Sequence, residues 1–346
     1  MDKTAIILFN LGGPDRLESV QPFLFNLFND PAIIGAPQPI RWLIAKLISK
    51  RRAPIAQEIY RELGGGSPLL PNTVAQAAAL ENVLNAKNSD NVVKCFPVMR
   101  YWHPMADAVA SEVRSWDPDR IVLLPLYPQF STTTSGSSFK DWERAARRAQ
   151  LSVPTTKVCC YPENPGFVSA VAERIKVALA ETTGDGPLRI LFSAHGLPKK
   201  VVDRGDPYKW AIEKTAAAVM TQIGESSLDW RVCYQSRVGP LEWIKPYTED
   251  EIRQAGNEGT ALIVVPIAFV SEHSETLVEL DIEYRELAEE SGVPGYRRVG
   301  TVSDDPSFIE GLSEIVLQAI ARGPGLASET GTRSCPVSCG QCPVSG

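Results

Sequence analysis

The stretch LRILFSAHGLP, residues 188–198, joins a short apolar run to a turn that contains polar residues, glycine and proline. Similar β-rich runs recur along the chain, and most of them end in a polar or glycine-rich cluster before a helix-like stretch. They span residues 4–9, 92–98, 120–126, 188–193, 230–234 and 261–269. Apolar runs that alternate with helical patterns are typical of buried parallel strands, so we predict an α/β fold. In such sheets ligands bind beyond the carboxyl ends of the strands, and polar residues gather there in this chain.

A faint internal repeat relates the two halves of the chain. Residues 96–104 and 233–243 each place an arginine in a turn after a strand, and residues 123–137 resemble residues 264–277. The simplest architecture with this pattern has two similar halves with a cleft between them. Any pair of βα units can look this alike, so the repeat is also compatible with no duplication.

Composition narrows the class of protein. The chain has 346 residues, 44% hydrophobic and 22% charged residues and a formal net charge of −6. These values are ordinary for a globular protein, and the acidic balance argues against a global basic field for nucleic acid. The longest apolar run, residues 261–270, is shorter than the about 20 residues that span a bilayer. The first apolar run is also too short for a signal peptide, so we expect a protein of the cytoplasm or of a membrane surface.

Residues 36–52 have the pattern of an amphipathic helix. The apolar residues recur at helical spacing, and they are Ile40, Leu43, Ile44, Leu47 and Ile48. The cations between them are Arg41, Lys46, Lys50, Arg51 and Arg52, and Trp42 lies beside the apolar stripe. One interpretation is a helix packed on the core with a solvated face. The other is an exposed lip that touches an anionic membrane or a hydrophobic substrate.

Two of the three histidines follow predicted strands. His195 comes after residues 188–193, and His273 comes after residues 261–269, whereas we interpret His103 as structural. A histidine near neutral pH can both accept a proton and bind a metal. The sequence therefore points to His195 and His273 as candidates for catalysis.

Glu275, Glu279 and Glu283 follow His273 at intervals of four residues. On an α-helix this spacing places the three carboxylates in one stripe. The stripe is either an exposed acidic face or a path that carries protons or divalent cations between the histidines and solvent.

Three cysteines, Cys335, Cys339 and Cys342, crowd the end of the chain with the spacing C-x3-C-x2-C. A closed four-cysteine site needs a fourth thiolate, and the adjacent Cys159 and Cys160 are the candidates. Iron–sulfur and zinc fit this spacing equally well, and the alternative is a disordered tail with free thiols.

Several motifs together resemble the ferrochelatase family, whose members insert ferrous iron into protoporphyrin IX to give haem. They read LFNLGGPD, RRAPIAQEIYRELGGGSPL, RYWHP, YPQFSTTTSGSS, SAHGLP, CYQSRVGPLEW and PIAFVSEHSETLVELDIEY, in that order. The resemblance implies a chelatase-like fold of two Rossmann-like halves, with parallel sheets around a central porphyrin cleft. The halves would be residues 1–160, with the lip at residues 31–52, and residues 161–322. Residues 323–346 would form the cysteine-bearing tail.

The resemblance also implies roles for single residues. His195 resembles the histidine that accepts pyrrole protons or binds iron. Glu275 resembles the carboxylate partner of that histidine, and His273 resembles a residue that supports the pair. Glu279 and Glu283 resemble an acidic path for metal or protons. The positions similar to those that hold the propionates or line the pocket are Leu11, Arg51, Tyr60, Ser67, Arg100, Tyr101, Ser236 and Trp243.

The implied protein is a lyase of haem biosynthesis with protoporphyrin IX and ferrous iron as substrates. The cysteine tail resembles the 2Fe–2S site of some members, with zinc as the alternative metal. Thr132 stands where animal members have a cluster cysteine, which favours Cys159 or Cys160 as the fourth ligand. We expect a cytoplasmic location, with the lip at the inner face of the membrane or in contact with a second copy of the chain. Rival functions are a coproporphyrin ferrochelatase and a haem or metal carrier without catalysis.

Overall fold

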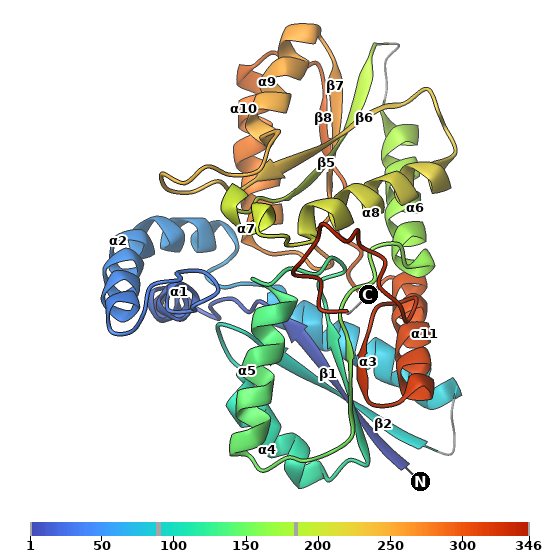
Figure 1. Ribbon diagram of the computed structural model, residues 1–346. Coiled ribbons are helices and arrows are strands. Elements are labelled where there is room, and N and C mark those ends of the chain that lie inside the picture. The colour runs from blue at the N-terminus through green and yellow to red at the C-terminus, as the bar shows by residue number, and fades with distance from the viewer. Residues whose placement is uncertain (1, 88–90, 183–185, 345–346) are drawn as a thin grey trace. The chain divides into compact units, whose positions relative to one another are not determined.

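The computed structural model describes residues 2–87, 91–182 and 186–344, and it divides into two compact units (Figure 1). The first unit is Met1–Cys160 with Ser313–Gly331, and the second is Tyr161–Leu312 with Thr332–Gly346. The expected halves at residues 1–160 and 161–322 stay a prediction, as does the cleft between them. Among the described residues, no helix combines the length and apolar character needed to cross a membrane.

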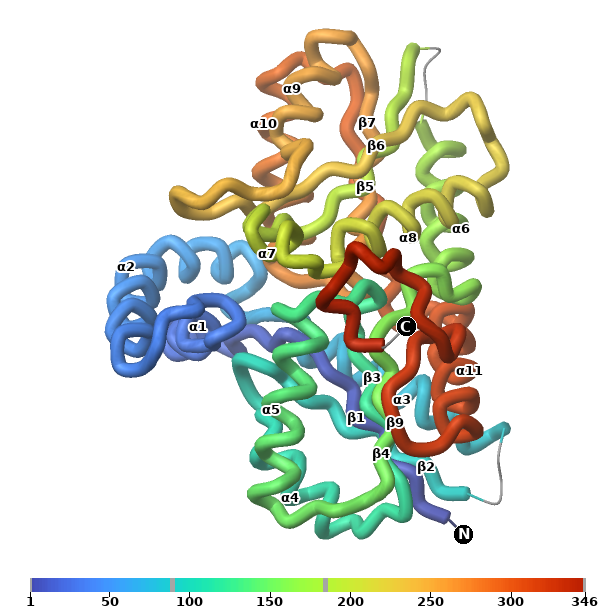
Figure 2. Tube along the Cα trace, in the orientation of Figure 1, coloured from blue at the N-terminus to red at the C-terminus, as the bar shows by residue number. Residues whose placement is uncertain are grey.

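The first unit is built on a five-stranded parallel sheet. Its strand order is β2 (Asn91–Met99), β1 (Asp2–Asn10), β3 (Arg120–Pro125), β4 (Thr155–Val158) and β9 (Gly325–Ala327). The apolar run at residues 4–9 becomes the centre of β1, which lies beside β2 and β3 (Figure 2). In these ladders Ile6 pairs in register with Cys95 and Val122. Residues 5–8 of this strand are fully buried, as expected for a strand covered on both faces.

Helices and one short 3₁₀ turn connect these strands. The elements are η1 (Leu17–Ser19), α1 (Val20–Phe28), α2 (Ile40–Glu62), α3 (Leu69–Lys87), α4 (Ala106–Trp116) and α5 (Ser135–Arg148). Helix α11 (Pro306–Arg322) begins in the second unit and enters the first unit at Ser313. Helix α2 begins within the predicted amphipathic segment and continues past it to Glu62. Part of its apolar stripe faces solvent, because Ile40, Leu43 and Leu47 are 53%, 59% and 60% exposed. Ile44 and Ile48 are half-buried and Ala45 is buried, so another side of the helix packs on the protein. The packed helix and the exposed lip both stay predictions for this segment.

The second unit has a four-stranded parallel sheet. Its strand order is β6 (Asp229–Gln235), β5 (Leu188–His195), β7 (Ala261–Pro266) and β8 (Tyr296–Arg298). The β-rich runs that sequence reading identified all become strands of the two sheets, which confirms the predicted α/β fold. In the second unit, His195 pairs with Gln235 at the carboxyl ends of β5 and β6.

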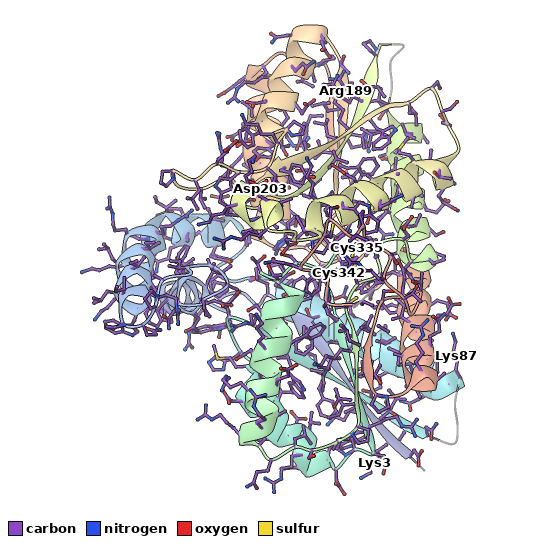
Figure 3. The ribbon with its side chains drawn as sticks, viewed as in Figure 1. Lys3, Lys87, Arg189, Asp203, Cys335 and Cys342 are labelled. Carbon is purple, nitrogen blue, oxygen red and sulfur yellow. The ribbon has the colours of Figure 1, made fainter. Side chains whose placement is uncertain are left out.

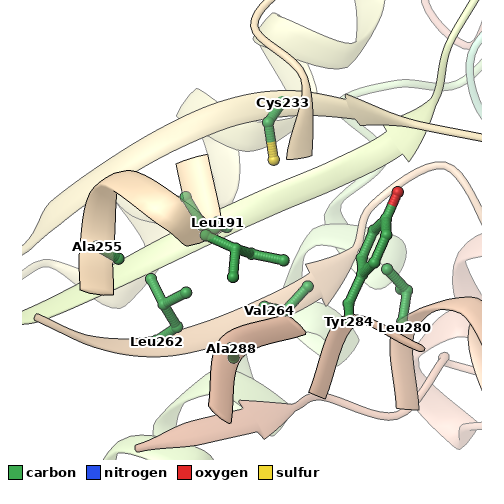
Figure 4. Close-up of a cluster of buried hydrophobic side chains, with 9 residues drawn as sticks. Leu191, Cys233, Ala255, Leu262, Val264, Leu280, Tyr284 and Ala288 are labelled. Carbon is green, nitrogen blue, oxygen red and sulfur yellow. The ribbon is translucent and has the colours of Figure 1, made fainter. Parts of the chain in front are cut away.

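The helices of the second unit lead into the residues of interest. They are α6 (Pro165–Glu181), α7 (Lys199–Asp203), α8 (Tyr208–Ile223), α9 (Thr248–Glu258), η2 (Glu275–Glu283) and α10 (Tyr284–Glu290). A buried apolar cluster joins Leu191 and Val264 of the sheet to Leu280 of η2 and Tyr284 of α10 (Figure 4). This cluster anchors η2 to the strands whose ends carry the histidine and glutamine.

The segment η2 is a π-helix, in which hydrogen bonds run over five residues instead of four. Sequence reading assumed an α-helical stripe of Glu275, Glu279 and Glu283, and that assumption is wrong. Residues four apart lie close to one turn apart in either type of helix, so the three glutamates still follow one side of η2. π-Helical segments occur frequently at functional sites.

Candidate active site

The carboxyl ends of the strands in the second unit bring three predicted site residues together. His195 ends β5, and the chain after β7 leads to His273 and Glu275. The Nδ1 atom of His195 lies 2.9 Å from Oε2 of Glu275, within hydrogen-bond distance. The Nε2 atom of His273 lies 3.8 Å from the same oxygen. One carboxylate oxygen of Glu275 therefore faces both histidines.

These contacts shift all three pKa values. Burial opposes ionisation of Glu275, but the two neighbouring histidines outweigh it and lower its pKa to about 2. Burial also lowers the pKa of His195, but the charge and hydrogen bond of Glu275 outweigh it, so the pKa is raised. For His273 burial prevails and its pKa is lowered. The site thus holds an ionised carboxylate beside one imidazole with a raised pKa and one with a lowered pKa.

The ring of His273 is more enclosed than that of His195. It is buried against Phe269, with ring centroids 4.5 Å apart, and its Nδ1 atom has no hydrogen-bond partner among the described residues. A buried ring nitrogen without a partner is rare and marks a site worth a functional explanation.

Glu279, one turn further along η2, lies in a cage of hydrogen bonds. Its carboxylate accepts hydrogen bonds from the Ser236 main-chain nitrogen at 2.8 Å and the Ser236 hydroxyl at 2.5 Å. Gln235 Nε2 and the Tyr284 hydroxyl each donate to it at 3.1 Å. Burial, followed by the charge of Glu275, raises the pKa of Glu279 to about 7. This carboxyl therefore gains and loses its proton in the neutral range.

Glu283 lies at the end of η2 and is exposed. Partial burial, followed by the charge of Glu286, raises its pKa above the ordinary value. The three glutamates of the sequence pattern thus differ: Glu275 stays ionised, Glu279 titrates near neutrality and Glu283 faces solvent.

Close backbone packing shapes the wall beside His195. A Cβ atom on Gly196 would meet the carbonyl oxygen of Gln235 at 3.0 Å and the ring of Trp243 at 3.1 Å. The buried Trp243 ring lies edge-on to His195 with centroids 6.2 Å apart. The hydroxyl of Tyr208 donates to the main-chain oxygen of His195 at 3.0 Å and fixes the strand end.

In the first unit, predicted substrate-binding residues form a second group. Tyr60 and Tyr101 are buried in one apolar cluster, and Leu11 packs against it. Ser67 lies against Gly13, since a Cβ atom there would collide with the serine side chain. The Ser67 main-chain nitrogen also donates to the carbonyl of Pro14 at 2.8 Å. The loop after β1 and the start of α3 are therefore held tightly together.

Arg100 and Tyr101 meet a buried carboxylate that sequence reading did not identify. Oδ2 of Asp30 accepts hydrogen bonds from Arg100, Tyr101 and Ser137 at 2.8, 2.8 and 2.5 Å. Arg100 is thus committed to an ion pair inside the first unit, whereas Arg51 on α2 is exposed.

Similarity to known proteins identifies the family to which this chain belongs. The sequence model of the family described as Ferrochelatase matches residues 3–320. The chain belongs to the ferrochelatase family. It is 50% identical to the ferrochelatase of Caulobacter vibrioides over 341 residues, which cover 99% of this chain and 97% of that protein. The ferrochelatase of Phenylobacterium zucineum is 52% identical over 340 residues, covering 98% and 97% of the two chains.

Solved structures show the same fold at low identity. The sirohydrochlorin chelatase SirB of Bacillus subtilis, solved with Fe3+, aligns with a TM-score of 0.54 at 13% identity and covers 93% of this chain and 97% of its own. The chelatase-like protein DR2241 of Deinococcus radiodurans gives a TM-score of 0.51 at 14% identity, covering 94% of this chain and 56% of its own. Ferrochelatases are lyases that insert a metal ion into a porphyrin. The predictions of family, chelatase-like fold and reaction are confirmed.

The ferrochelatase tail carries the predicted cluster cysteines within the second unit. The thiols of Cys335 and Cys342 are in hydrogen-bonding contact, and Figure 3 labels both. In the first unit, Cys159 is buried, Cys160 is partly buried and their sulfur atoms lie 3.1 Å apart. Within the described parts of the chain, no three His, Cys, Asp or Glu side chains are arranged to hold a metal ion. The 2Fe–2S site and the zinc alternative stay predictions.

Sequence reading missed a buried polar chain behind the glutamates. The Ser193 hydroxyl donates to Oε1 of Gln235 at 2.7 Å and contacts the hydroxyl of Thr248 at 2.9 Å. That contact orients the Gln235 amide, whose nitrogen donates to Glu279 and to the carbonyl of Glu275. Neutral polar residues inside strands form no repeating pattern that would identify them as site residues. The position of Gln235 at a strand end could nevertheless have suggested that it belongs to the site.

Proposed function

We propose that this ferrochelatase forms protohaem by inserting ferrous iron into protoporphyrin IX, with His195 as the pyrrole-proton acceptor. Two N–H protons must leave the pyrroles before a metal ion can bind between the four nitrogens. The carboxylate of Glu275 engages Nδ1 of His195, so Nε2 is the nitrogen that can take a proton from the porphyrin. The contact between His195 and Glu275 is the observation that carries this proposal, because it makes the imidazole a stronger base.

The remaining glutamates of η2 serve as the route for protons or metal. Glu275 stabilises the imidazolium that forms at His195, and buried His273 holds the other side of the same oxygen. Glu279 can receive the proton next, because its pKa of about 7 lies near that of an imidazole. Glu283 completes the path at the exposed end of η2. Imidazole and carboxylate are suitable ligands for ferrous iron, so His195 and Glu275 also serve as its binding groups.

The residues that hold the porphyrin come from both groups described above. Trp243 and Ser236 of the second unit line the ring, and Ser236 does so while bonded to Glu279. In the first unit Leu11, Tyr60 and Ser67 contact the macrocycle and Arg51 attracts its propionates. Arg100 and Tyr101 are paired with buried Asp30, so their part in substrate binding is to support the wall behind these residues. A rigid apolar site that binds a bent macrocycle would expose the pyrrole lone pairs, with strain of roughly 1–5 kcal/mol drawn from remote binding energy.

The experiment that tests this assignment compares His195→Ala and Glu275→Gln with the wild type. Purified protein is mixed anaerobically with protoporphyrin IX or coproporphyrin and Fe(II) or Zn(II), and the visible bands report insertion. Each variant should lose insertion while porphyrin still binds, as measured by fluorescence. His103→Ala, in the exposed turn of the first unit, is the matched control and should turn over normally.

The outcomes separate the rival functions. Near-normal turnover in either site variant would contradict the assignment. Preferred turnover of coproporphyrin would identify a coproporphyrin ferrochelatase. Tight retention of haem without turnover in the wild type would identify a carrier.

The exposed apolar face of α2 serves as a lip on the inner face of the membrane. It offers Leu43 and Leu47 to the acyl region and Lys46 and Lys50 to anionic headgroups. The chain should float with anionic vesicles, and a Leu43→Ser and Leu47→Ser double variant should not. Val177→Ser, on an exposed apolar residue of α6, is the control. A second outcome would assign this face to a second copy of the chain. In that case the wild type would not float with vesicles but would form a dimer, and the double variant would stay a monomer.

A 2Fe–2S cluster is bound by Cys335, Cys339 and Cys342 with Cys159 or Cys160. The tail segment suits this role, because Arg333 donates to the main-chain oxygens of Cys335 and Cys339 at 3.1 and 3.0 Å and folds the segment into a loop. Thiolates bind both iron–sulfur clusters and zinc. When bound, the cluster supplies iron–thiolate bonds that tie the tail to the body of the protein.

The cluster proposal is tested on anaerobically purified protein by iron and sulfide analysis and by the visible and electron paramagnetic resonance spectra. Two irons and two sulfides per chain are expected, and Cys342→Ser should abolish the signal. Single serine variants of Cys159 and Cys160 identify the fourth ligand. Stoichiometric zinc without sulfide would assign the site to zinc instead.

A further inference from the structure

Arg298, at the end of β8, has a buried side chain that joins two acidic residues on either side of Glu275. Its side chain is 9% exposed. One outer nitrogen, Nη1, donates to both carboxylate oxygens of Glu272 at 2.9 and 3.1 Å. The other, Nη2, lies 2.6 Å from Oδ2 of Asp281. A planar guanidinium can bridge two carboxylates in this way, whereas an ammonium group acts as a single point charge.

Glu272 connects this arginine to the residue that follows it, His273. Its Oε1 atom also accepts the main-chain N–H of Thr301 at 2.9 Å, and its Oε2 atom accepts the hydroxyl of Thr276 at 2.5 Å. Oγ1 of Thr276 lies 3.0 Å from the main-chain nitrogen of His273 and accepts its N–H. The carboxylate of Glu272 is therefore saturated by structural contacts that fix the backbone at the start of η2.

Asp281 connects the same arginine to the body of the π-helix. It lies six residues after Glu275, and Arg285 reaches its Oδ1 atom at 3.6 Å. Arg298 thus holds one point before the helix and one point inside it, and Glu275 lies between them. The Nε atom of Arg298 is buried and has no hydrogen-bond partner in the described part of the chain. Buried donors without a partner are rare in folded proteins, so this nitrogen needs an explanation.

We propose that Arg298 is a positioning residue for metal insertion, which holds η2 so that Glu275 faces both His195 and His273. The inference rests on the proposed function, because it assigns a task to the same three residues. In the described part of the chain, Arg298 has no hydrogen bond or ion pair to His195, His273 or Glu275. It acts through the backbone on either side of Glu275, and its charge also contributes to the lowered pKa of His273. Glu272 and Asp281 are accordingly structural anions of this clamp and do not belong to the path formed by Glu279 and Glu283.

The test compares Arg298→Lys and Arg298→Ala with Arg297→Ala in the full chain. Arg297 is the matched control, since it neighbours Arg298 on β8 and pairs with Glu181 where both side chains are about half exposed. Loss of a residue that orients a metal-binding group lowers activity by about 10- to 100-fold. We expect that fall in kcat for zinc insertion into protoporphyrin in both Arg298 variants, with KM for the porphyrin changed less than about 3-fold. Arg297→Ala should keep wild-type values.

Chemical rescue distinguishes positioning from general support of the fold. Guanidinium ion at low millimolar concentration should restore part of kcat in Arg298→Ala, and sodium chloride at equal ionic strength should not. If Arg298→Ala fails to fold, Asp281→Asn takes its place, because it removes one arm of the clamp and leaves Glu272 paired. A folded Arg298→Lys or Asp281→Asn with wild-type kcat would overturn the proposal, as would a loss confined to KM. An inactive wild type would instead refute the proposed function itself.

Discussion

Glu279→Gln should remove a specific part of the pH dependence of stability. Burial, followed by the charge of Glu275, raises the pKa of Glu279 from 4.5 to about 7. The folded protein therefore binds this proton more tightly than the unfolded chain does. The resulting stabilisation is fully present below pH 4.5 and is lost as the pH rises through about 7. Integration of the difference in bound protons gives a loss of about 2–3 kcal/mol in the free energy of unfolding between about pH 5 and about pH 8.

Urea unfolding followed by tryptophan fluorescence over that pH range measures the effect. The free energy of unfolding of the wild type, relative to that of Glu279→Gln, should fall by about 2–3 kcal/mol across the range, because glutamine mimics the protonated carboxyl and does not titrate. Glu289→Gln, on an exposed position of α10, should run parallel to the wild type. An infrared band of a protonated carboxyl should disappear near neutral pH in the wild type and be absent from Glu279→Gln. A stability difference that stays constant with pH would refute the reasoning.

Three further substitutions test other contacts. Glu275→Gln should lower the pKa of His195, because burial already acts in that direction and the Glu275 charge is what opposes it; an unchanged imidazole titration by NMR would contradict this. Gly196→Ala should lower the free energy of unfolding by about 1–3 kcal/mol, since the new methyl group would press on the Trp243 ring. A variant that unfolds at the same urea concentration as the wild type would contradict this prediction. Asp30→Asn should cost at least about 2 kcal/mol, because it leaves its arginine partner without the buried charge; a melting temperature equal to the wild type would exclude that role.

Sequence reading predicts the sheets well because buried parallel strands are continuous apolar runs. Residues 4–9 and 188–193 have this signature and become the central strands β1 and β5. The short strands β4, β8 and β9 were missed, because three or four residues are too few to show a pattern. These short strands form because they pair with strands that lie far away in the sequence, and a local sequence pattern does not reveal such pairing.

The candidate site was predictable where a rare residue type follows a strand. His195 and His273 stand out in a chain with three histidines, and both lie against Glu275. Arg298 and Asp30 were missed for a physical reason: a charged residue reads as a surface residue unless its buried partner is known. Their partners lie tens of residues away along the chain, so no local pattern reveals them.

Two carboxylates four residues apart on η2 acquire opposite character because their neighbours differ. In a stripe on an exposed α-helix both would have nearly ordinary pKa values. Here the anchoring of η2 turns Glu275 toward two imidazoles, which keep it ionised, and turns Glu279 toward Ser236 and a buried environment. The permanent charge of Glu275 then raises the pKa of Glu279, in addition to the effect of burial. The charge that makes His195 a stronger base therefore also raises the proton affinity of Glu279. Pairs of titratable groups whose surroundings drive their pKa values apart, as here for Glu275 and Glu279, are the usual basis of acid–base work in enzymes.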